Sequence, residues 1–254
     1  MPQSLQWCHE QLILMHANAH VGHLGGNLSC IDALYHAFAT LNPHDRFILS
    51  KGHSAGALYT VLAAYGQIPS AWLQTFHQDN TKLPGHPPAN TIEAIPFATG
   101  SLGHGLSLAA GFALSQRMRA TPAKTICLTS DGEWQEGSTW EALIFLAHHQ
   151  LTNLMVLIDL NGWQGFGATN QVASMHDLAD KIRAFPVALS IIDGHDSDQI
   201  TAALATQPTQ PHFIILNTVK GHRLPEVADT LQSHYLPPTA PQVSQALSYI
   251  HGVS

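Results

Sequence analysis

Charged side chains are scarce in this sequence of 254 residues. Lys, Arg, Asp and Glu together make up 11% of it, against roughly 25% in an average soluble domain. Because 45% of the residues are hydrophobic, we expect a folded chain with a large core, part of whose surface is covered by another chain. The net charge of −7 argues against a broad surface for nucleic acid or an anionic membrane, so a bound polyanion needs a local site.

The sequence is also poor in cysteine and lacks targeting signals and long apolar runs. The three cysteines (Cys8, Cys30 and Cys127) are odd in number and form no C-x-x-C pair, which argues against a disulfide framework or a zinc site. The segment Met1–Trp7 has neither the basic nor the apolar region of a signal peptide. No apolar run approaches the roughly 20 residues that span a bilayer. We therefore expect a cytoplasmic protein that does not bind membranes.

The order of the expected elements predicts an α/β fold. Helices are expected over 3–19, 29–40, 54–65, 69–77, 105–119, 137–149, 175–184 and 196–205. Strands are expected over 46–49, 124–129, 153–158, 187–192 and 212–217. Continuous apolar strands that alternate with helices are typical of a doubly wound, mostly parallel sheet with helices on both faces. We expect a single domain over 1–254, in which 222–254 form a proline-rich tail with a short helix that ends near 251.

Polar side chains follow two of these strands. Asp131 comes directly after the strand at 124–129, and Asn161 follows the strand at 153–158. Because ligands bind outside the carboxyl ends of parallel strands, these two side chains are expected to lie on one rim of the sheet. A carboxylate and an amide oxygen suit Mg²⁺, which completes its coordination with phosphate oxygens and water. The alternative is that Asp131-Gly132 and Asn161-Gly162 are ordinary turns.

A glycine-rich segment, Thr99–Gly105, directly precedes a predicted helix. Glycines let the backbone approach a ligand closely, and a helix N-terminus favours acceptor groups. The order G-x-x-G-x-G matches neither the dinucleotide fingerprint nor the Walker pattern. A simple helix-start loop therefore remains the alternative.

Histidine is abundant, with 18 residues in the chain. His23, His53 and His86 each lie in a glycine-containing connection, where functional side chains concentrate. Imidazoles there can hydrogen-bond phosphate or sugar hydroxyls and can move protons near neutral pH. A zinc site is the alternative, but none of these three histidines belongs to an H-x-x-x-H pair, and no cysteine partner supports such a site.

Taken together, these motifs resemble one family. They occur in the order Gly22–Ser29, Asp45–His53, Gly85–Pro87, Thr99–Gly105, Ser130–Ala142, Asp159–Gln164 and Asp193–Asp196. In this order they look like the thiamine diphosphate-binding, N-terminal domain of transketolase. The resemblance extends from about residue 10 to 235. The pattern Glu-Gly-x-x-Trp-Glu-Ala favours transketolase over the pyruvate dehydrogenase branch.

The resemblance implies a role for each matching residue. The Mg²⁺ ligands would be the side chains of Asp131 and Asn161 and the backbone carbonyl of Trp163. The cofactor-binding residues would be His53, Gly100, Ser101, Leu102, Asp131, Gly132, Glu133, Asn161 and Lys220. The catalytic residues would be His23, His53, His86 and His234 in the substrate channel, together with Glu136 in an acidic network between paired cofactor sites.

The resemblance also implies a partner and a reaction. The resemblance covers only the first domain of the family, so we expect a companion chain to supply the pyrimidine-binding domain, in an α₂β₂ assembly. With thiamine diphosphate and Mg²⁺, the pair would transfer a two-carbon ketol unit from a ketose to an aldose, acting on sugars or sugar phosphates. The alternatives are a related thiamine diphosphate-dependent subunit with an unusual acceptor, and a non-catalytic regulatory subunit.

Two departures from the family pattern motivate the alternative of a regulatory subunit. Ser130 stands where the family has glycine, and the usual Lys-Gly-x-Gly segment is Lys220-Gly221-His222-Arg223, without its last glycine.

Overall fold

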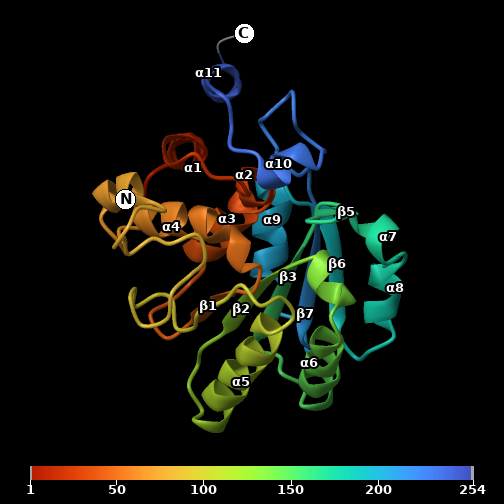
Figure 1. Cartoon of the computed structure of the whole chain (residues 1–254). Coiled ribbons are helices and arrows are strands. Elements are labelled where there is room, and N and C mark those ends of the chain that lie inside the picture. The colour runs from red at the N-terminus through yellow and green to blue at the C-terminus, as the bar shows by residue number, and fades with distance from the viewer. Residues whose placement is uncertain (1, 253–254) are drawn as a thin grey trace.

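The computed structural model describes residues 2–252 and contains a five-stranded, fully parallel sheet at its centre (Figure 1). Its strands are β1 (Arg46–Leu49), β2 (Thr125–Ser130), β3 (Leu154–Leu160), β7 (His212–Asn217) and β6 (Ala188–Asp193), in this spatial order. The predicted doubly wound α/β fold is therefore confirmed. Each predicted strand is present to within one or two residues.

Helices cover both faces of the sheet, and the alternation of buried strand residues shows how. In β2, Ile126 and Leu128 pack into one core with α1 (Leu5–Ala19), α3 (Ile31–Ala39), α4 (Ala55–Ala64) and α9 (Ser197–Ala205). Cys127, on the opposite face of the same strand, packs into a second core with α5 (Gly105–Met118), α6 (Gly137–His148) and α8 (Leu178–Arg183). Successive side chains of a strand point to opposite faces, so a strand that is buried throughout supplies both cores.

Two helix predictions need correction, and one further helix was not predicted. Residues 70–75 form a 3₁₀ helix, η2 (Ser70–Thr75), in place of the helix expected over 69–77, and the backbone leaves the helical conformation at Phe76. The helix expected over 29–40 is confirmed as α3, and the unpredicted helix α2 (Leu24–Leu28) precedes it. The helix expected over 175–184 shortens to α8, whose N-cap Asp177 has a left-handed backbone with φ +58°.

The boundary of α2 has a packing reason. This short helix contains Gly25 and Gly26, two residues with poor helix propensity. A Cβ at Gly25 would lie 2.4 Å from the hydroxyl of Ser233. Close contact between two segments that are far apart in the sequence therefore overrides the local preference, and helix propensity alone does not predict α2.

The loops at the carboxyl edge of the sheet contain several short elements that the sequence analysis did not predict. They are η1 (Gly52–Ser54), η3 (Gly132–Gln135), the antiparallel pair β4 (Trp163–Gln164) and β5 (Gly167–Ala168), and α7 (Thr169–Val172). Most of them lie in or directly beside segments that the sequence analysis singled out for ligand binding.

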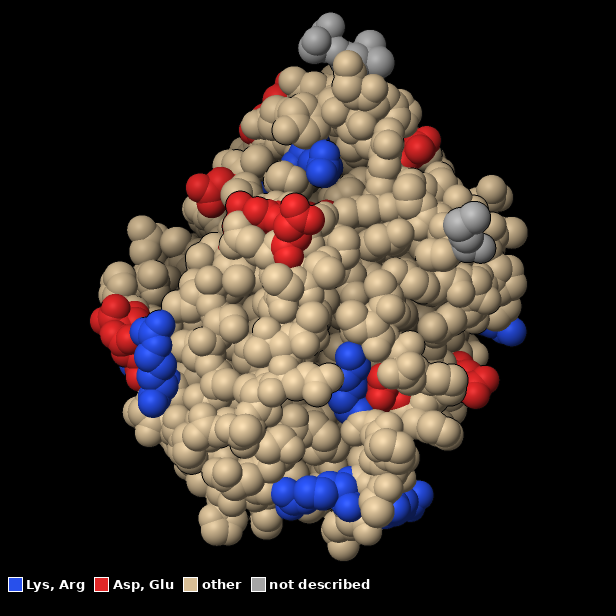
Figure 2. Space-filling model, turned by 180° about the vertical axis from the view of Figure 1, so that it is seen from behind, with Lys and Arg blue, Asp and Glu red and all other residues tan. Residues whose placement is uncertain are grey.

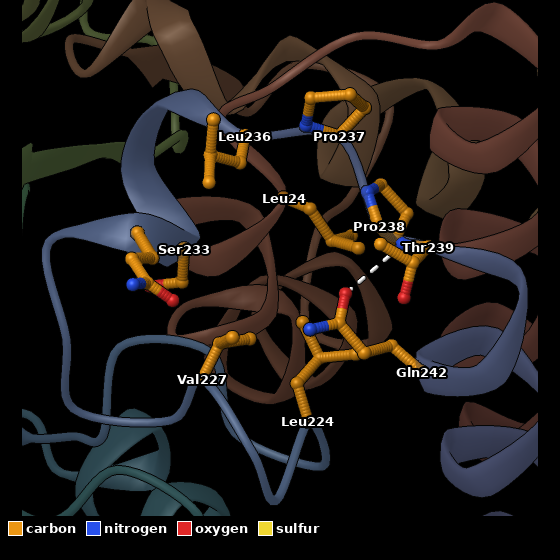
Figure 3. A pocket seen from close by; sticks show the side chains of 10 residues that line it. Leu24, Leu224, Val227, Ser233, Leu236, Pro237, Pro238, Thr239 and Gln242 are labelled. Carbon is orange, nitrogen blue, oxygen red and sulfur yellow. Dashed lines mark hydrogen bonds between the residues drawn. The ribbon is translucent and has the colours of Figure 1, made fainter.

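The C-terminal tail packs against the N-terminal helices. It contains α10 (Gln232–Tyr235) and α11 (Ala240–Ile250), which begins with a capping box formed by Thr239 and Gln242. A small cavity of about 60 Å³ lies between this tail and α2; Figure 3 shows Leu24, Leu224 and Val227 beside it. The tail is thus a folded part of the described chain, close to the segment that carries His23.

The surface has few charges. Figure 2 shows the molecule from behind, with uncharged side chains over most of that face. Within residues 2–252, no helix is both long enough and apolar enough to cross a bilayer.

Candidate functional site

The ends of β2 and β3 bring Asp131 and the loop of Asn161 together. The two strands are parallel neighbours, with Ser130 opposite Asp159. The backbone N–H of Gly162 donates to Asp131 Oδ2 over 2.9 Å, and the hydroxyl of Thr169 donates to the same oxygen over 2.9 Å. The two segments therefore meet at the carboxyl edge of the sheet, as their strand-end positions predict.

Asp131 is a buried carboxylate that has no cationic partner in direct contact among residues 2–252. It is 2% exposed. Burial, together with the neighbouring charge of Asp159, raises the pKa of Asp131 to about 6, and the hydrogen bond from Thr169 offsets only part of this rise. Burying a charge is costly unless it is compensated. A divalent cation at Asp131 would supply that compensation.

The oxygen donors around Asp131 fit Mg²⁺. Asn161 is buried, and its Oδ1 accepts from the backbone N–H of Trp163 over 3.1 Å. The Trp163 carbonyl accepts from Lys220 Nζ over 3.1 Å and has a second lone pair available. A carboxylate, an amide oxygen and a carbonyl form the hard oxygen set that Mg²⁺ prefers.

Lys220 adds positive charge beside these oxygens. Burial, followed by repulsion from Lys51, lowers its pKa to about 8. Its ammonium also lies 2.8 Å from His234 Nδ1, which accepts a hydrogen bond from it. The site therefore combines oxygen donors for a cation with a buried ammonium suited to a phosphate.

The predicted histidines His23, His53, His86 and His234 form one group. The ring centroid of His23 lies 4.9 Å from that of His234, 5.7 Å from that of His53 and 6.4 Å from that of His86. Burial and then the neighbouring His86 lower the pKa of His23 to about 4, while burial and then Lys220 lower that of His234 to about 3. Burial also lowers the pKa of His53, with Lys51 and Lys220 adding to it.

These imidazoles are neutral near pH 7, so each ring offers one donor and one acceptor. Nδ1 of His23 is buried without a hydrogen-bond partner in the described part of the chain. A buried nitrogen without a hydrogen-bond partner in such a group indicates a place where a polar ligand can bind.

The backbone of α10 holds His234 beside His23. The N–H of His23 donates to the carbonyl of His234 over 2.7 Å. A Cβ at Gly22 would lie 2.2 Å from the carbonyl oxygen of Tyr235, so only glycine permits this approach. The two histidines meet although 211 positions separate them in the sequence (234 − 23).

The glycine-rich segment lies against the strand ends. Gly100 and Gly103 have φ values of +142° and +81°, which side-chain-bearing residues rarely adopt. A Cβ at Gly52 would lie 2.6 Å from the backbone nitrogen of Gly100. Ser101 is exposed and Leu102 is partly so. The loop therefore presents Gly100–Leu102 at the surface near His53, which lies next to Gly52.

Glu133 and Glu136 have very different surroundings. Glu133 is fully buried, and its carboxylate accepts from the hydroxyl of Ser50 and from the backbone N–H groups of Gly103 and Ser130. We therefore assign Glu133 to holding the glycine-rich loop rather than to direct contact with a ligand. Glu136 is exposed. Its position beside Gly103 leaves it available to a partner.

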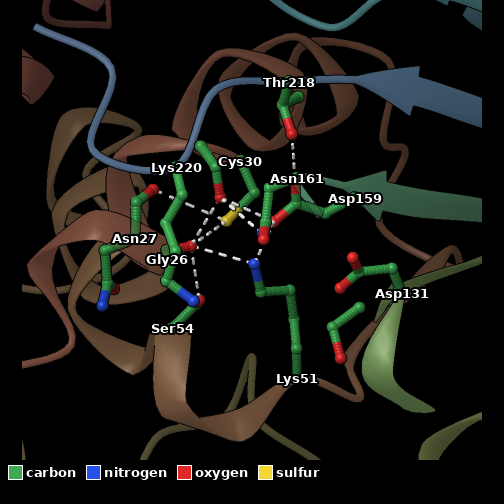
Figure 4. A network of polar contacts seen from close by, with 12 residues as sticks. Gly26, Asn27, Cys30, Lys51, Ser54, Asp131, Asp159, Asn161, Thr218 and Lys220 are labelled. Carbon is green, nitrogen blue, oxygen red and sulfur yellow. Dashed lines mark hydrogen bonds and ion pairs between the residues drawn. The ribbon is translucent and has the colours of Figure 1, made fainter. Parts of the chain in front are cut away.

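A network of buried polar groups that the sequence analysis missed lies beneath the site (Figure 4). Lys51 and Asp159 form an ion pair with both side chains fully buried. Burial alone would raise the pKa of Asp159, but Lys51 holds it below its ordinary value. The position of Asp159, two residues before Asn161 at the end of a buried strand, is the signal that could have revealed it.

A second cluster surrounds Asp32 and includes residues that follow the carboxyl ends of β6 and β7. Its two oxygens accept from His9 Nε2 and His195 Nδ1, each over 2.7 Å, and His195 Nε2 accepts from the N–H of Val219 over 3.0 Å. His222 stacks on His195 with centroids 3.7 Å apart. Ligand atoms of Asp32, His195 and His222 lie within 4.8 Å of one another. Because both nitrogens of His195 are engaged, we interpret the cluster as a structural network.

Comparison with known proteins decides the family. Residues 14–252 match the family described as transketolase, thiamine diphosphate binding domain. This chain belongs to the transketolase family. The resemblance inferred from its motifs is therefore confirmed.

Two curated relatives have nearly the same extent as this chain. An apulose-4-phosphate transketolase subunit of Actinobacillus succinogenes is 34% identical over 250 residues, which cover 93% of this chain and 91% of that protein. The 6-deoxy-6-sulfo-D-fructose transketolase subunit of a Clostridium species is 37% identical over 227 residues, which cover 84% of this chain and 82% of the relative.

Solved transketolases share the fold but are much longer. The transketolase of Campylobacter jejuni matches with a TM-score of 0.89 and 28% identity over 97% of this chain and 42% of its own. A transketolase of Pichia stipitis gives the same TM-score with 27% identity, over 98% of this chain and 41% of its own. The present chain thus spans about 40% of the length of the solved transketolases that it matches.

Proposed function

We propose that this chain is the thiamine diphosphate-binding subunit of a two-chain transketolase. With its partner it would transfer a two-carbon ketol unit from a ketose to an aldose. The observation that supports this most strongly is that Lys220 joins the loop beside Asp131 to the histidine group, through its contacts with the Trp163 carbonyl and with His234 Nδ1. Two relatives of similar extent that are named as transketolase subunits support the two-chain assignment.

In this proposal the strand ends hold the cofactor. Asp131, Asn161 and the carbonyl of Trp163 would ligate Mg²⁺. Gly132, His53 and Lys220 would contact the diphosphate, and Gly100, Ser101 and Leu102 would face the aminopyrimidine ring. When bound, thiamine diphosphate supplies the carbanion chemistry that breaks and forms the carbon–carbon bond.

The protein's own contribution would be placement and proton transfer. His23, His86 and His234 would hydrogen-bond the hydroxyls and carbonyl of the donor ketose. Neutral imidazoles suit this task because each has both a donor and an acceptor nitrogen. The named substrates of the two relatives are a sugar phosphate and a sulfosugar, which supports an anionic sugar as the substrate class.

A partner chain would complete the site with its pyrimidine-binding domain. The exposed Ser101 and Glu136 lie where such a chain can reach them. The charge-poor surface in Figure 2 also suits an extensive interface. We propose an α₂β₂ assembly of single-domain chains in the cytoplasm, with the tail from residue 222 as part of this domain.

The test is to co-express the chain with its candidate pyrimidine-domain partner and purify the complex. We expect calorimetry to show Mg²⁺-dependent binding of thiamine diphosphate and a ketose panel to give ketol transfer to aldoses. A complex that binds no thiamine diphosphate would contradict the cofactor assignment. Binding without transfer from any donor would contradict the transketolase activity and favour a regulatory role or a related enzyme with another acceptor.

A further inference from the structure

The side-chain amide of Asn161 has two different ends, of which only the oxygen can ligate a cation. Its Nδ2 donates to Asp159 Oδ2 over 2.9 Å, and its Oδ1 accepts from the backbone N–H of Trp163 over 3.1 Å. Because a carboxylate only accepts hydrogen bonds, Asp159 can face the nitrogen end of this amide but not the oxygen end. The orientation of Asn161 is therefore set at its nitrogen end by Asp159 and at its oxygen end by the N–H of Trp163.

Asp159 is itself held rigidly. Its Oδ2 accepts from Lys51 Nζ and from the hydroxyl of Ser29, the latter over 2.6 Å, in addition to Asn161. Its Oδ1 accepts from the hydroxyl of Thr218. Four donors, three of them from distant parts of the chain, thus converge on one carboxylate. Figure 4 shows Lys51, Asn161 and Thr218 around Asp159.

Because both oxygens of Asp159 already accept hydrogen bonds, Asp159 differs in role from Asp131. Asp159 is fully buried and paired with an ammonium, whereas no lysine of the described residues lies within ion-pair distance of Asp131. Lys51 is fixed in turn by the carbonyl of Gly26, which accepts from its Nζ over 2.9 Å. Asp159 is therefore not free to serve as a ligand.

We propose that Asp159, anchored by Lys51, is a positioning residue that turns the amide oxygen of Asn161 toward the cation site. This inference rests on the proposed function, because it takes Asn161 to be a Mg²⁺ ligand. Residues that orient metal ligands from behind change metal affinity by roughly 10–100-fold when they are replaced.

The test compares two double variants, Lys51→Met with Asp159→Asn and Lys51→Met with Asp159→Leu. They differ only in whether residue 159 offers a hydrogen-bond acceptor, and neither contains an unpaired buried lysine. Asp159→Asn keeps an oxygen toward Asn161, and Asp159→Leu has nearly the same shape but no acceptor. Binding of Mn²⁺, a spectroscopic substitute for Mg²⁺, is measured on the full chain by electron paramagnetic resonance, with and without thiamine diphosphate.

We expect the leucine variant to bind Mn²⁺ roughly 10–100-fold more weakly than the asparagine variant. Adding Asn161→Asp to the leucine variant should restore affinity, because a carboxylate has oxygen at both ends. Circular dichroism and thermal unfolding without metal establish that the variants are folded. The wild-type chain and single Asp159→Asn, in which Lys51 keeps an oxygen partner, are the references.

Equal Mn²⁺ affinity of the two folded variants would overturn the inference, and so would weak binding that Asn161→Asp does not rescue. If the leucine variant does not fold, the Mn²⁺ affinity of the single variant Asp159→Ser is measured in its place. The shorter serine side chain moves the acceptor away from Asn161, so an affinity equal to that of the wild type would overturn the inference. If the wild-type chain itself binds no Mn²⁺ in the presence of thiamine diphosphate, the proposed function fails, and this inference fails with it.

Discussion

The buried carboxylate of Glu133 accepts a hydrogen bond from the backbone N–H of Gly103 over 2.9 Å. This contact ties the glycine-rich loop to the segment that follows β2. The same carboxylate also accepts from the hydroxyl of Ser50 and from the N–H of Ser130. One side chain thus fixes three segments that border the candidate cofactor site.

We expect Glu133→Gln to destabilise the fold by about 1–3 kcal/mol. A glutamine has a single oxygen, so at least one of the buried N–H groups of Gly103 and Ser130 loses its acceptor. The free energy of unfolding is measured with urea. Glu136→Gln is the matched control, because Glu136 is exposed and its replacement should change stability by less than about 0.5 kcal/mol. Equal effects of the two changes would contradict the role assigned to Glu133.

Asp131→Asn should raise the stability of the metal-free protein and lower its affinity for Mg²⁺ and thiamine diphosphate. Without a cation, the change removes an uncompensated buried charge, so we expect the free energy of unfolding to rise by roughly 1–2 kcal/mol at pH 7. With Mg²⁺ and thiamine diphosphate, we expect affinity to fall at least about 100-fold, because a charged ligand is lost. Thermal unfolding and calorimetry measure the two effects.

The control for this change is Asp45→Asn. Asp45 is also buried, but it precedes β1 at the opposite end of the sheet and accepts from the backbone N–H groups of Asn42 and Lys124. Its replacement should lower stability and leave cofactor affinity unchanged. A fall of stability for Asp131→Asn without any loss of affinity would contradict the cation site.

The buried imidazole of His16 should make the fold sensitive to acid. Burial lowers its pKa from 6.5 to about 4, so the unfolded chain takes up a proton before the folded chain does. Its contribution to stability is therefore present above pH 6.5 and is lost as the pH falls toward 4, with a loss on the order of 3 kcal/mol. Equilibrium unfolding across this range measures the effect.

His16→Gln is the variant that isolates this contribution. Glutamine does not titrate and can still donate to the carbonyl of Gly22, which contacts His16 Nδ1 over 2.9 Å. The pH dependence of unfolding should be shallower in the variant by the amount due to one histidine. If the unfolding free energies of the two proteins have the same pH dependence, His16 has the same pKa in the folded and unfolded chains, which would contradict the prediction.

Arg223 has a left-handed backbone with φ +71° at the position where the family motif ends in glycine. We expect Arg223→Gly to be about 1 kcal/mol more stable than Arg223→Ala, because glycine adopts this backbone without strain. Both variants lose the contact of the guanidinium with the ring of Tyr249. The difference in unfolding free energy between them therefore measures the backbone strain alone, and a difference near zero would contradict it.

The sheet and the meeting of Asp131 with the loop of Asn161 could be predicted, because both follow from local signals. Apolar runs bounded by turn residues place the strands, and parallel pairing brings their carboxyl ends together. The position of Asp159 could have been read from the same strand. Its partner Lys51 could not, because nothing local distinguishes a buried lysine from an exposed one.

Long-range packing explains the other differences. The short helix α2 packs Gly25 against Ser233, and the neighbourhood of His23 and His234 depends on the same approach of α10. After the 3₁₀ helix at 70–75, the backbone turns extended at Phe76 while its side chain still packs into the core. Such features are properties of the assembled tertiary structure and leave little trace in a local window.

The ion pair of Lys51 and Asp159 joins residues 108 positions apart. During synthesis, the ammonium of Lys51 must therefore stay hydrated until the ribosome has delivered well over half of the chain. Burying the ammonium before its carboxylate partner is present would be costly. We therefore expect the N-terminal helices to pack on the sheet late, after β3 has joined it. The cofactor site would then mature only near the end of translation, when β7 and the tail arrive.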